Sequence, residues 1–332
     1  MGAPDVATPD NRSFCSTLSP IAGEPLAGTA PTRRTWLLVE HPGPWGREPM
    51  ADAPWPDGLG AALAQATVAT GVRMLAVRRH DARPIGGPPA QPFVALALAG
   101  PQGGAVSRRL ESPQQLRDLP LAELAAGRRP AAGSGWADAG PLWGVCTQGT
   151  RDACCARLGR RIAEDLTALD PEHTWEISHS GGHRFAPVLL AWPEGLTYGR
   201  VPAERLGELV DARRQGRVVP DLLRGRVHQP EPEQAAELKL RSVLGLAALD
   251  AVRPAAPPTA PGDDAVGSGD GAAGDGIGAD AGNGRLPTWW QAGGRTWRVD
   301  VRRVGLPDRP ASCGKAPEPA SAWICDDPVP VA

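Results

Sequence analysis

The sequence has few aromatic residues other than tryptophan and no long apolar run. It contains three Phe and one Tyr beside eleven Trp. No segment reaches the roughly 18 consecutive apolar residues that a transmembrane helix requires. The first residues, MGAPDVATPDNRSF, lack the charged and apolar regions of a signal peptide. We therefore expect a soluble, cytoplasmic protein without a membrane partner.

Signals for nucleic-acid and nucleotide binding are also missing. The net charge is -2, and Lys and Arg are scattered along the chain, whereas nucleic-acid-binding domains gather basic residues on one face. Neither a GxGxxG nor a GxxxxGK phosphate loop is present, so we expect no bound nucleotide or flavin.

Two consecutive segments show the same β-α-β-β-β-α order of predicted elements. Segment 35–126 has strands at 36–40, 72–77, 93–99 and 106–109 and helices at 58–70 and 113–125. Segment 141–230 has strands at 142–145, 174–177, 188–191 and 197–201 and helices at 154–169 and 203–214. This order predicts an α/β fold with two thioredoxin-like units in series, either as a duplicated module or as one mixed sheet.

The remaining segments are predicted to be linkers and additions to these units. Residues 1–34 form an N-terminal extension, and the Gly/Ala/Pro stretch 127–140 is a linker. A helix is predicted over 231–253, followed by a flexible Gly/Asp/Pro linker over 254–285. The C-terminal part, 286–332, is predicted to form a β-hairpin around Gly293-Gly294 and a tail.

Cysteines at the start of the second unit are candidate metal ligands. Cys146 ends a predicted strand, and Cys154 and Cys155 open the following helix. The unpaired N–H groups at a helix start stabilise the thiolate, which is the form that binds metal. We expect Arg151, in the same loop, to donate hydrogen bonds to the ligand sulfurs without binding the metal itself.

Two histidines follow in a glycine-rich turn. His179 and His183 flank Gly181-Gly182, which favours a turn over a helix and lets both imidazoles converge after the strand 174–177. Two thiolates and two imidazoles suit either a tetrahedral zinc ion or a 2Fe-2S cluster with histidines at one iron. The residue types alone leave both possibilities open.

The pattern Cys-x8-Cys with Arg-Asp inside the loop, followed by His-x-Gly-Gly-His, resembles the sucrase/ferredoxin-like family of thioredoxin-like ferredoxins. The segments WLLVEHPGPWG, LLRGRVHQPEPEQAAE and RPASCGK extend the resemblance from about Phe14 to Trp323. It implies a 2Fe-2S cluster on two cysteines and two histidines, one-electron transfer with redox partner proteins, and proton coupling through the histidines. The implied ligands are Cys146, Cys155, His179 and His183, with Cys154 as the alternative to Cys155.

Two other functions remain open: a structural zinc-binding interaction module and a thiol-disulfide oxidoreductase. The absence of a CxxC pair at the helix start argues against the second. Despite the family's name, no pair of carboxylates is placed for glycoside hydrolysis. We therefore expect an electron carrier without catalytic residues rather than a hydrolase.

Other residues are expected to stay outside the site. Cys313 and Cys325 have no His or Cys neighbour at ligand spacing, so we expect neither to bind metal. Arg224 and Arg226 are expected on a solvated surface, from which they could steer a negatively charged redox partner.

Overall fold

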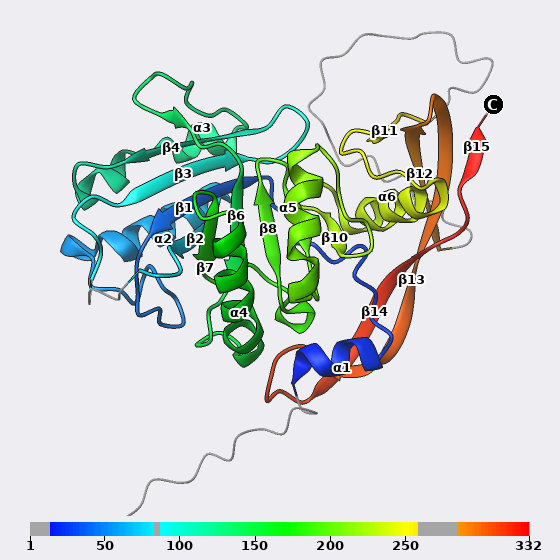
Figure 1. Cartoon of the computed structure of the whole chain (residues 1–332), viewed down its shortest axis with the longest axis horizontal. Coiled ribbons are helices and arrows are strands. Elements are labelled where there is room, and N and C mark those ends of the chain that lie inside the picture. Colours follow the sequence, from blue (N-terminus) through cyan, green and yellow to red (C-terminus); the bar gives the residue numbers. More distant parts are fainter. Residues whose placement is uncertain (1–13, 83–86, 258–283, 332) are drawn as a thin grey trace, which may run out of the picture.

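The computed structural model describes residues 14–82, 87–257 and 284–331 (Figure 1). Most of the predicted linker 254–285 and the first part of the predicted extension 1–34 lie outside the described residues. Within them the fold is mixed α/β, with a ten-stranded sheet, a second smaller sheet and six α-helices. None of the helices in these ranges is long and apolar enough to cross a membrane.

The large sheet repeats one strand arrangement in its two halves. The strands lie in the order β10-β9-β8-β6-β7-β2-β1-β3-β4-β5, in which the edge strands β10 and β5 are Leu223–Arg226 and Ala137–Asp138. In each half the first strand is parallel to the second and antiparallel to the third, which pairs antiparallel with the fourth. The strands are β1 (Thr35–Glu40), β2 (Arg73–Arg78), β3 (Phe93–Leu98), β4 (Gly104–Arg109), β6 (Leu142–Cys146), β7 (Thr174–Ile177), β8 (Leu189–Trp192) and β9 (Leu196–Tyr198). Both halves therefore build one mixed sheet, which is one of the two arrangements that the sequence left open.

Antiparallel pairing of β2 with β7 joins the two halves. Val77 lies opposite Ile177, and Arg78 lies opposite Glu176. The Arg78 guanidinium donates to the buried Glu176 carboxylate at 2.7 Å, and Thr147 donates to the same oxygen. This junction places the end of β7 beside the first half of the molecule.

Helices cover one face of the curled sheet, and the other face is buried because residues of its two halves, such as Trp36 and Trp192, pack against one another. In the second half, α4 (Ala153–Leu169) and α5 (Leu206–Arg214) pack on one face, whereas α2 (Leu59–Thr70) covers the first half (Figure 1). Every residue of β6 is buried, as expected for a strand with both faces covered. Its apolar sequence LWGVC ends on Cys146.

Two predicted helices have different ends in the structure. The predicted helix 113–125 is a 3-10 segment (Pro113–Asp118) and the short α3 (Leu121–Ala125), separated at Pro120. Proline removes a backbone donor and disfavours helical geometry in the residue before it. The predicted helix 231–253 is α6 (Glu231–Leu244), which ends on the left-handed Gly245.

The C-terminal part forms the second sheet. Its strands are β11 (Val252–Pro254), β12 (Arg285–Ala292), β13 (Arg295–Pro310), β14 (Pro317–Cys325) and β15 (Val329–Val331). The predicted hairpin joins β12 to β13 through Gly293 and Gly294, which both have positive φ, as a type I′ turn requires.

The second sheet connects distant parts of the chain. It packs against α6, and the long β13–β14 ribbon extends to α1 (Cys15–Ile21) (Figure 1). The sequence patterns did not indicate α1, β14, β15 or the short strands β5 (Ala137–Asp138) and β10 (Leu223–Arg226). The end of the predicted helix 231–253 and the start of the predicted linker 254–285 form β11 instead. The ribbon thereby brings the C-terminal region next to the first described helix.

Candidate metal centre

Two cysteines of the second half meet beside the start of α4. Cys146 is the last residue of β6, and Cys155 lies in the first turn of α4. Asp152 begins this helix, because its carboxylate accepts the backbone N–H of Cys154 at 2.9 Å. The sulfur atoms of Cys146 and Cys155 and a ring nitrogen of His179 all lie within 4.8 Å of one another. These three residues could hold a metal ion.

The histidines lie on the turn that follows β7. Gly181 and Gly182 both have positive φ, at 102° and 73°, so the chain turns sharply between the two imidazoles. The ring centroids of His179 and His183 are 5.2 Å apart. Because β6 and β7 are parallel, their carboxyl ends meet at one sheet edge and bring this turn to Cys146.

Charge is shared unequally between the two thiols. A hydrogen bond from Cys155 lowers the pKa of Cys146 well below its ordinary value, against the effect of burial. The His179 ring and the backbone N–H of Ser180 act in the same direction. The same sulfur-sulfur hydrogen bond, together with burial, raises the pKa of Cys155. The pair thus holds one thiolate readily, and the second proton is the one that a bound metal would displace.

The surroundings of Nδ1 in each histidine indicate which ring nitrogen is available to bind a metal. The Nδ1 atom of His179 is buried without a hydrogen-bond partner, an arrangement that is costly unless a ligand fills it. The Nδ1 atom of His183 lies 3.2 Å from Asp152 Oδ2. A carboxylate on one imidazole nitrogen fixes the ring and leaves the other nitrogen for a metal, which for His183 is Nε2.

Cys154 belongs to a different group of side chains. Its sulfur lies 3.5 Å from that of Cys15 and 3.1 Å from that of Cys313. Consecutive residues of an α-helix point about 100° apart, so Cys155 and Cys154 face different surroundings. The structure therefore groups Cys155, rather than Cys154, with Cys146. It also gives Cys313 the cysteine neighbours that its sequence spacing did not indicate.

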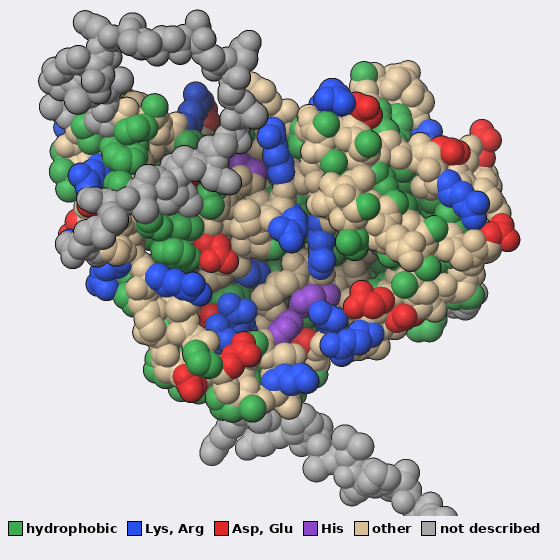
Figure 2. Space-filling view, turned by 180° about the vertical axis from the view of Figure 1, so that it is seen from behind, with side chains coloured by type: hydrophobic (Ala, Val, Ile, Leu, Met, Phe, Trp, Pro, Cys, Tyr) green, Lys and Arg blue, Asp and Glu red, His purple; other side chains and the backbone are tan. Residues whose placement is uncertain are grey.

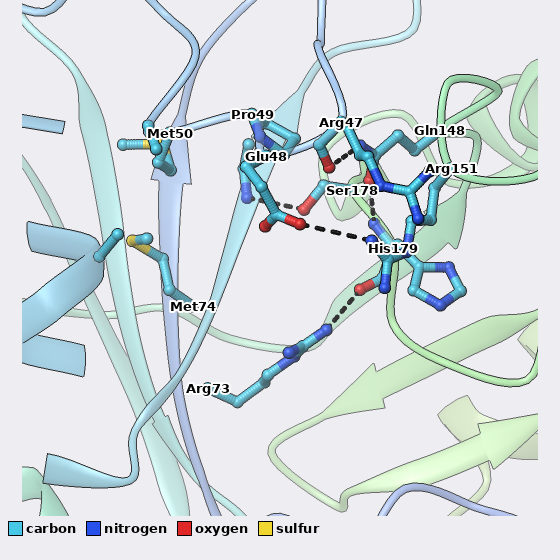
Figure 3. A pocket seen from close by; sticks show the side chains of 13 residues that line it. Arg47, Glu48, Pro49, Met50, Arg73, Met74, Gln148, Arg151, Ser178 and His179 are labelled. Atoms are coloured by element: carbon cyan, nitrogen blue, oxygen red, sulfur yellow. Dashed lines mark hydrogen bonds and ion pairs between the residues drawn. The ribbon is translucent and has the colours of Figure 1, made fainter. Parts of the chain in front are cut away.

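A cavity of about 400 Å³ opens beside His179 (Figure 3). Arg73 donates to the His179 carbonyl oxygen at 2.7 Å, and Gln148 accepts the His179 N–H at 2.7 Å. Arg151 also lines the cavity, where it forms an ion pair with Glu48 at 3.3 Å. Figure 2 shows one face of the molecule with histidine side chains in a hollow and Lys and Arg beside them. His179 and His183 are both only partly buried, and His179 lines the cavity, so the histidine side of the centre adjoins the surface.

Comparison with known families places these residues in context. The sucrase/ferredoxin-like family model matches residues 26–225, which is more than half of the chain. The chain belongs to the sucrase/ferredoxin-like family. This confirms the resemblance that the motifs indicated. No curated protein and no solved structure matches it.

The sucrase/ferredoxin-like segment includes the whole centre around Cys146 and ends within β10. Cys15 and Cys313 lie outside it. Among the described residues, two groups of side chains could hold a metal ion. One, around Cys146, lies inside the family segment, and the other, which consists of Cys15, Asp152, Cys154 and Cys313, reaches beyond it.

Arg224 is buried against the turn between His179 and His183, so the prediction that it lies on the surface is wrong. Its side chain is 2% exposed, and Nη1 donates to the Gly181 carbonyl oxygen at 3.3 Å. Burial lowers its pKa to about 9. A Cβ atom at Gly182 would clash with this guanidinium. Arg226 is also buried and pairs with Glu237, so neither arginine is free to steer a partner.

Replacement of Gly159 tests how closely α4 must approach β6 in this sucrase/ferredoxin-like protein. A Cβ atom at Gly159 would overlap the carbonyl oxygen of Cys146, so Gly159→Ala must push the helix and Cys155 away from the strand. Overpacking of this kind costs about 1–3 kcal/mol. We expect a lower Tm and a several-fold lower metal content, measured by circular dichroism and elemental analysis.

Gly207→Ala is the matched control, because no heavy atom lies within 4 Å of a Cβ at this position in α5. It should leave the metal content unchanged and stabilise the helix by about 0.5–1 kcal/mol. A Gly159→Ala protein with the wild-type Tm and metal content would contradict the close packing of α4 on β6.

Proposed function

We propose that the chain is a cytoplasmic 2Fe-2S protein that transfers one electron between redox partner proteins. Cys146 and Cys155 would bind one iron, and His179 and His183 would bind the other. The observation that carries this proposal is the convergence of two buried sulfurs and two imidazoles at one sheet edge. Membership of the sucrase/ferredoxin-like family supports it.

The spacing of the donors favours a binuclear centre over a single zinc ion. A tetrahedral zinc ion binds four donors at about 2.0–2.3 Å, which places them less than about 4 Å apart. Cys146, Cys155 and His179 meet within 4.8 Å, but His183 is not part of that group. A 2Fe-2S cluster distributes its ligands over two iron atoms and so accommodates a fourth ligand, His183, that lies outside the group of the other three.

The protein's own residues would hold and orient such a centre. When bound, the cluster would supply a one-electron couple whose potential is raised by neutral imidazole ligands. Asp152 fixes the His183 ring through Nδ1, and Arg73 and Gln148 hold the backbone of His179. Both sulfurs are buried, so the His179 side would face the partner through the adjoining cavity.

We interpret each half of the large sheet as a thioredoxin-like unit. A β-α-β unit followed by an antiparallel hairpin supports this interpretation in both segments, 35–126 and 141–230. Only the second unit carries the proposed ligands, since Cys146 ends its first strand and the histidines follow its second. The first unit would then contribute support and the cavity wall that contains Arg47 and Glu48.

Anaerobic purification tests the function directly. The protein should be red-brown, contain about two iron and two acid-labile sulfide per chain, and give a rhombic EPR signal after reduction. A colourless protein in which zinc occupies the Cys146 group would overturn the proposal in favour of a structural zinc module.

The reduction potential should depend on pH. Reduction of a bound cluster would add an electron beside two imidazoles, so each ligand histidine would then hold a proton on its distal nitrogen more tightly. Proton uptake on reduction raises the potential at low pH, and the potential should fall by about 59 mV per pH unit where one proton accompanies the electron. Spectroelectrochemical titration between acid and alkaline pH measures this slope.

Replacement of one proposed histidine ligand provides the control for this slope. His179→Cys should lower both the potential and its pH dependence, since thiolate is more negative than imidazole. A wild-type potential that stays constant over the whole pH range would exclude proton coupling.

A further inference from the structure

Three cysteines from distant parts of the chain meet beside the first turn of α4. Cys15 lies in α1, Cys154 in α4, and Cys313 in the loop between β13 and β14. Their sulfur atoms are 3.5 Å (Cys15–Cys154), 3.1 Å (Cys154–Cys313) and 3.6 Å (Cys15–Cys313) apart. Asp152 Oδ1 lies 3.2 Å from the Cys313 sulfur and 3.8 Å from that of Cys15. The four donors all lie within 4.8 Å of one another.

These separations fit a shared metal ion better than a disulfide. Three thiolates at about 2.3 Å from a tetrahedral zinc ion are about 3.8 Å apart, only slightly farther than the three distances observed. A disulfide brings two sulfurs to about 2.05 Å and would leave the third thiol packed against it without a partner. The arrangement of three nearly equidistant sulfurs therefore points to one metal ion bound by all three.

Asp152 is placed to complete a four-donor site. Its Oδ2 atom accepts from Ser312 Oγ and the Cys313 N–H, both at 2.9 Å, and faces His183. Its Oδ1 atom accepts one backbone N–H, from Cys154, and otherwise faces the thiols. A carboxylate oxygen has two lone pairs, so Oδ1 keeps one that is directed at the sulfurs.

A cation would offset the charge of this group. Asp152 is 4% exposed, and Cys15 and Cys154 are buried. Among the described residues, the ion-pair partner of Asp152 is His183, whose Nδ1 lies 3.2 Å from Oδ2, and no Lys or Arg pairs with this carboxylate. Deprotonation of the three thiols would add three negative charges beside it, which is costly in a buried site without a positive charge. A soft, divalent ion suits the sulfur donors and offsets two of these charges.

We propose that Cys15, Cys154, Cys313 and Asp152 bind one thiophilic divalent cation, of which zinc fits the donor set best. Four protein donors leave no open position, so the site is structural. It would fasten α1 and the tip of the β13–β14 ribbon to the start of α4 (Figure 1). This second site uses none of the four ligands assigned to the iron-sulfur cluster and does not rest on that assignment.

Metal analysis of matched serine variants tests the second site. The wild type, expressed with added zinc, should contain about one zinc per chain. Cys15→Ser and Cys313→Ser should each lower the zinc content at least ~10-fold and retain the iron. Cys325→Ser is the control, because Cys325 belongs to neither Cys group among the described residues. Its zinc and iron contents should equal those of the wild type.

Zinc K-edge absorption of the wild type decides the question even if a variant fails to fold. About three sulfur ligands near 2.3 Å and one oxygen at about 2.0–2.2 Å would support the site. Two sulfurs and two nitrogens would place the zinc on the Cys146 group and overturn the inference. So would a protein that holds no zinc, or a Cys154–Cys313 disulfide found by mass spectrometry. Zinc of the expected type without iron would overturn only the iron-sulfur proposal.

Discussion

Cys155→Ser should purify with at least ~10-fold less iron than the wild type, whereas Cys154→Ser should keep most of its iron. Loss of residues that merely orient a metal ligand already costs 10–100-fold in metal affinity, so loss of a sulfur ligand should cost at least as much. The Cys155 sulfur lies within 4.8 Å of the Cys146 sulfur and of a His179 ring nitrogen, whereas Cys154 is grouped with Cys15 and Cys313. Iron analysis and the visible spectrum of the two proteins measure the difference.

The two variants are matched because the exchanged side chains are neighbours in one helix turn and both are about 1% exposed. A general destabilisation of α4 would lower the iron content of both proteins equally. Retention of iron in Cys155→Ser with loss in Cys154→Ser would reverse the assignment of the ligand.

Glu237→Ala should lower the free energy of unfolding by about 3–5 kcal/mol, the usual cost of leaving buried charges without their partner. Glu237 is 2% exposed and accepts from Arg226 at 2.9 Å and from Arg241 at 2.8 Å. Burial alone would raise the pKa of Glu237, but the two arginines hold it below its ordinary value. Urea denaturation at neutral pH measures the loss.

The pH dependence of this effect follows from the lowered pKa. Glu237 stabilises the fold above the pKa of an unfolded glutamate, about 4.3, and this contribution is lost as the pH falls through the lower, folded value. Glu233→Ala, on the same helix and in no ion pair among the described residues, should change the stability by at most about 0.5–1 kcal/mol. Equal losses in the two variants would show that the buried ion pairs contribute nothing specific.

The centre around Cys146 was predictable because its signals are local. The candidate ligands follow two strands that a single helix connects, and a β-α-β connection makes those strands parallel neighbours. Parallel neighbours end at the same sheet edge, so Cys146 and the turn from His179 to His183 had to approach each other. The glycines between the histidines indicated the turn, and the spacing of Cys146 and Cys155 indicated the strand-to-helix loop.

Contacts between distant segments were not predictable from spacing. Cys15 and Cys313 are separated by 298 residues, and nothing in their local sequences indicates that α1 and the β13–β14 loop meet. Arg224 reads as a surface residue because arginine is seldom fully buried, yet its side chain donates hydrogen bonds to Gly181 and Thr29. In both cases the position of the side chain depends on contacts between segments that are far apart in the sequence, and local patterns do not reveal such contacts.

The span of each cysteine group sets an order of assembly during synthesis. Every ligand proposed for the iron centre lies between residues 146 and 183, so that centre could form while the ribosome is still adding the C-terminal sheet. The group of Cys15, Cys154 and Cys313 must wait for the loop between β13 and β14. A nascent chain that lacks this sheet would therefore be able to acquire the proposed iron but not the proposed second metal, which would make occupancy of that site a marker of a folded C-terminal sheet.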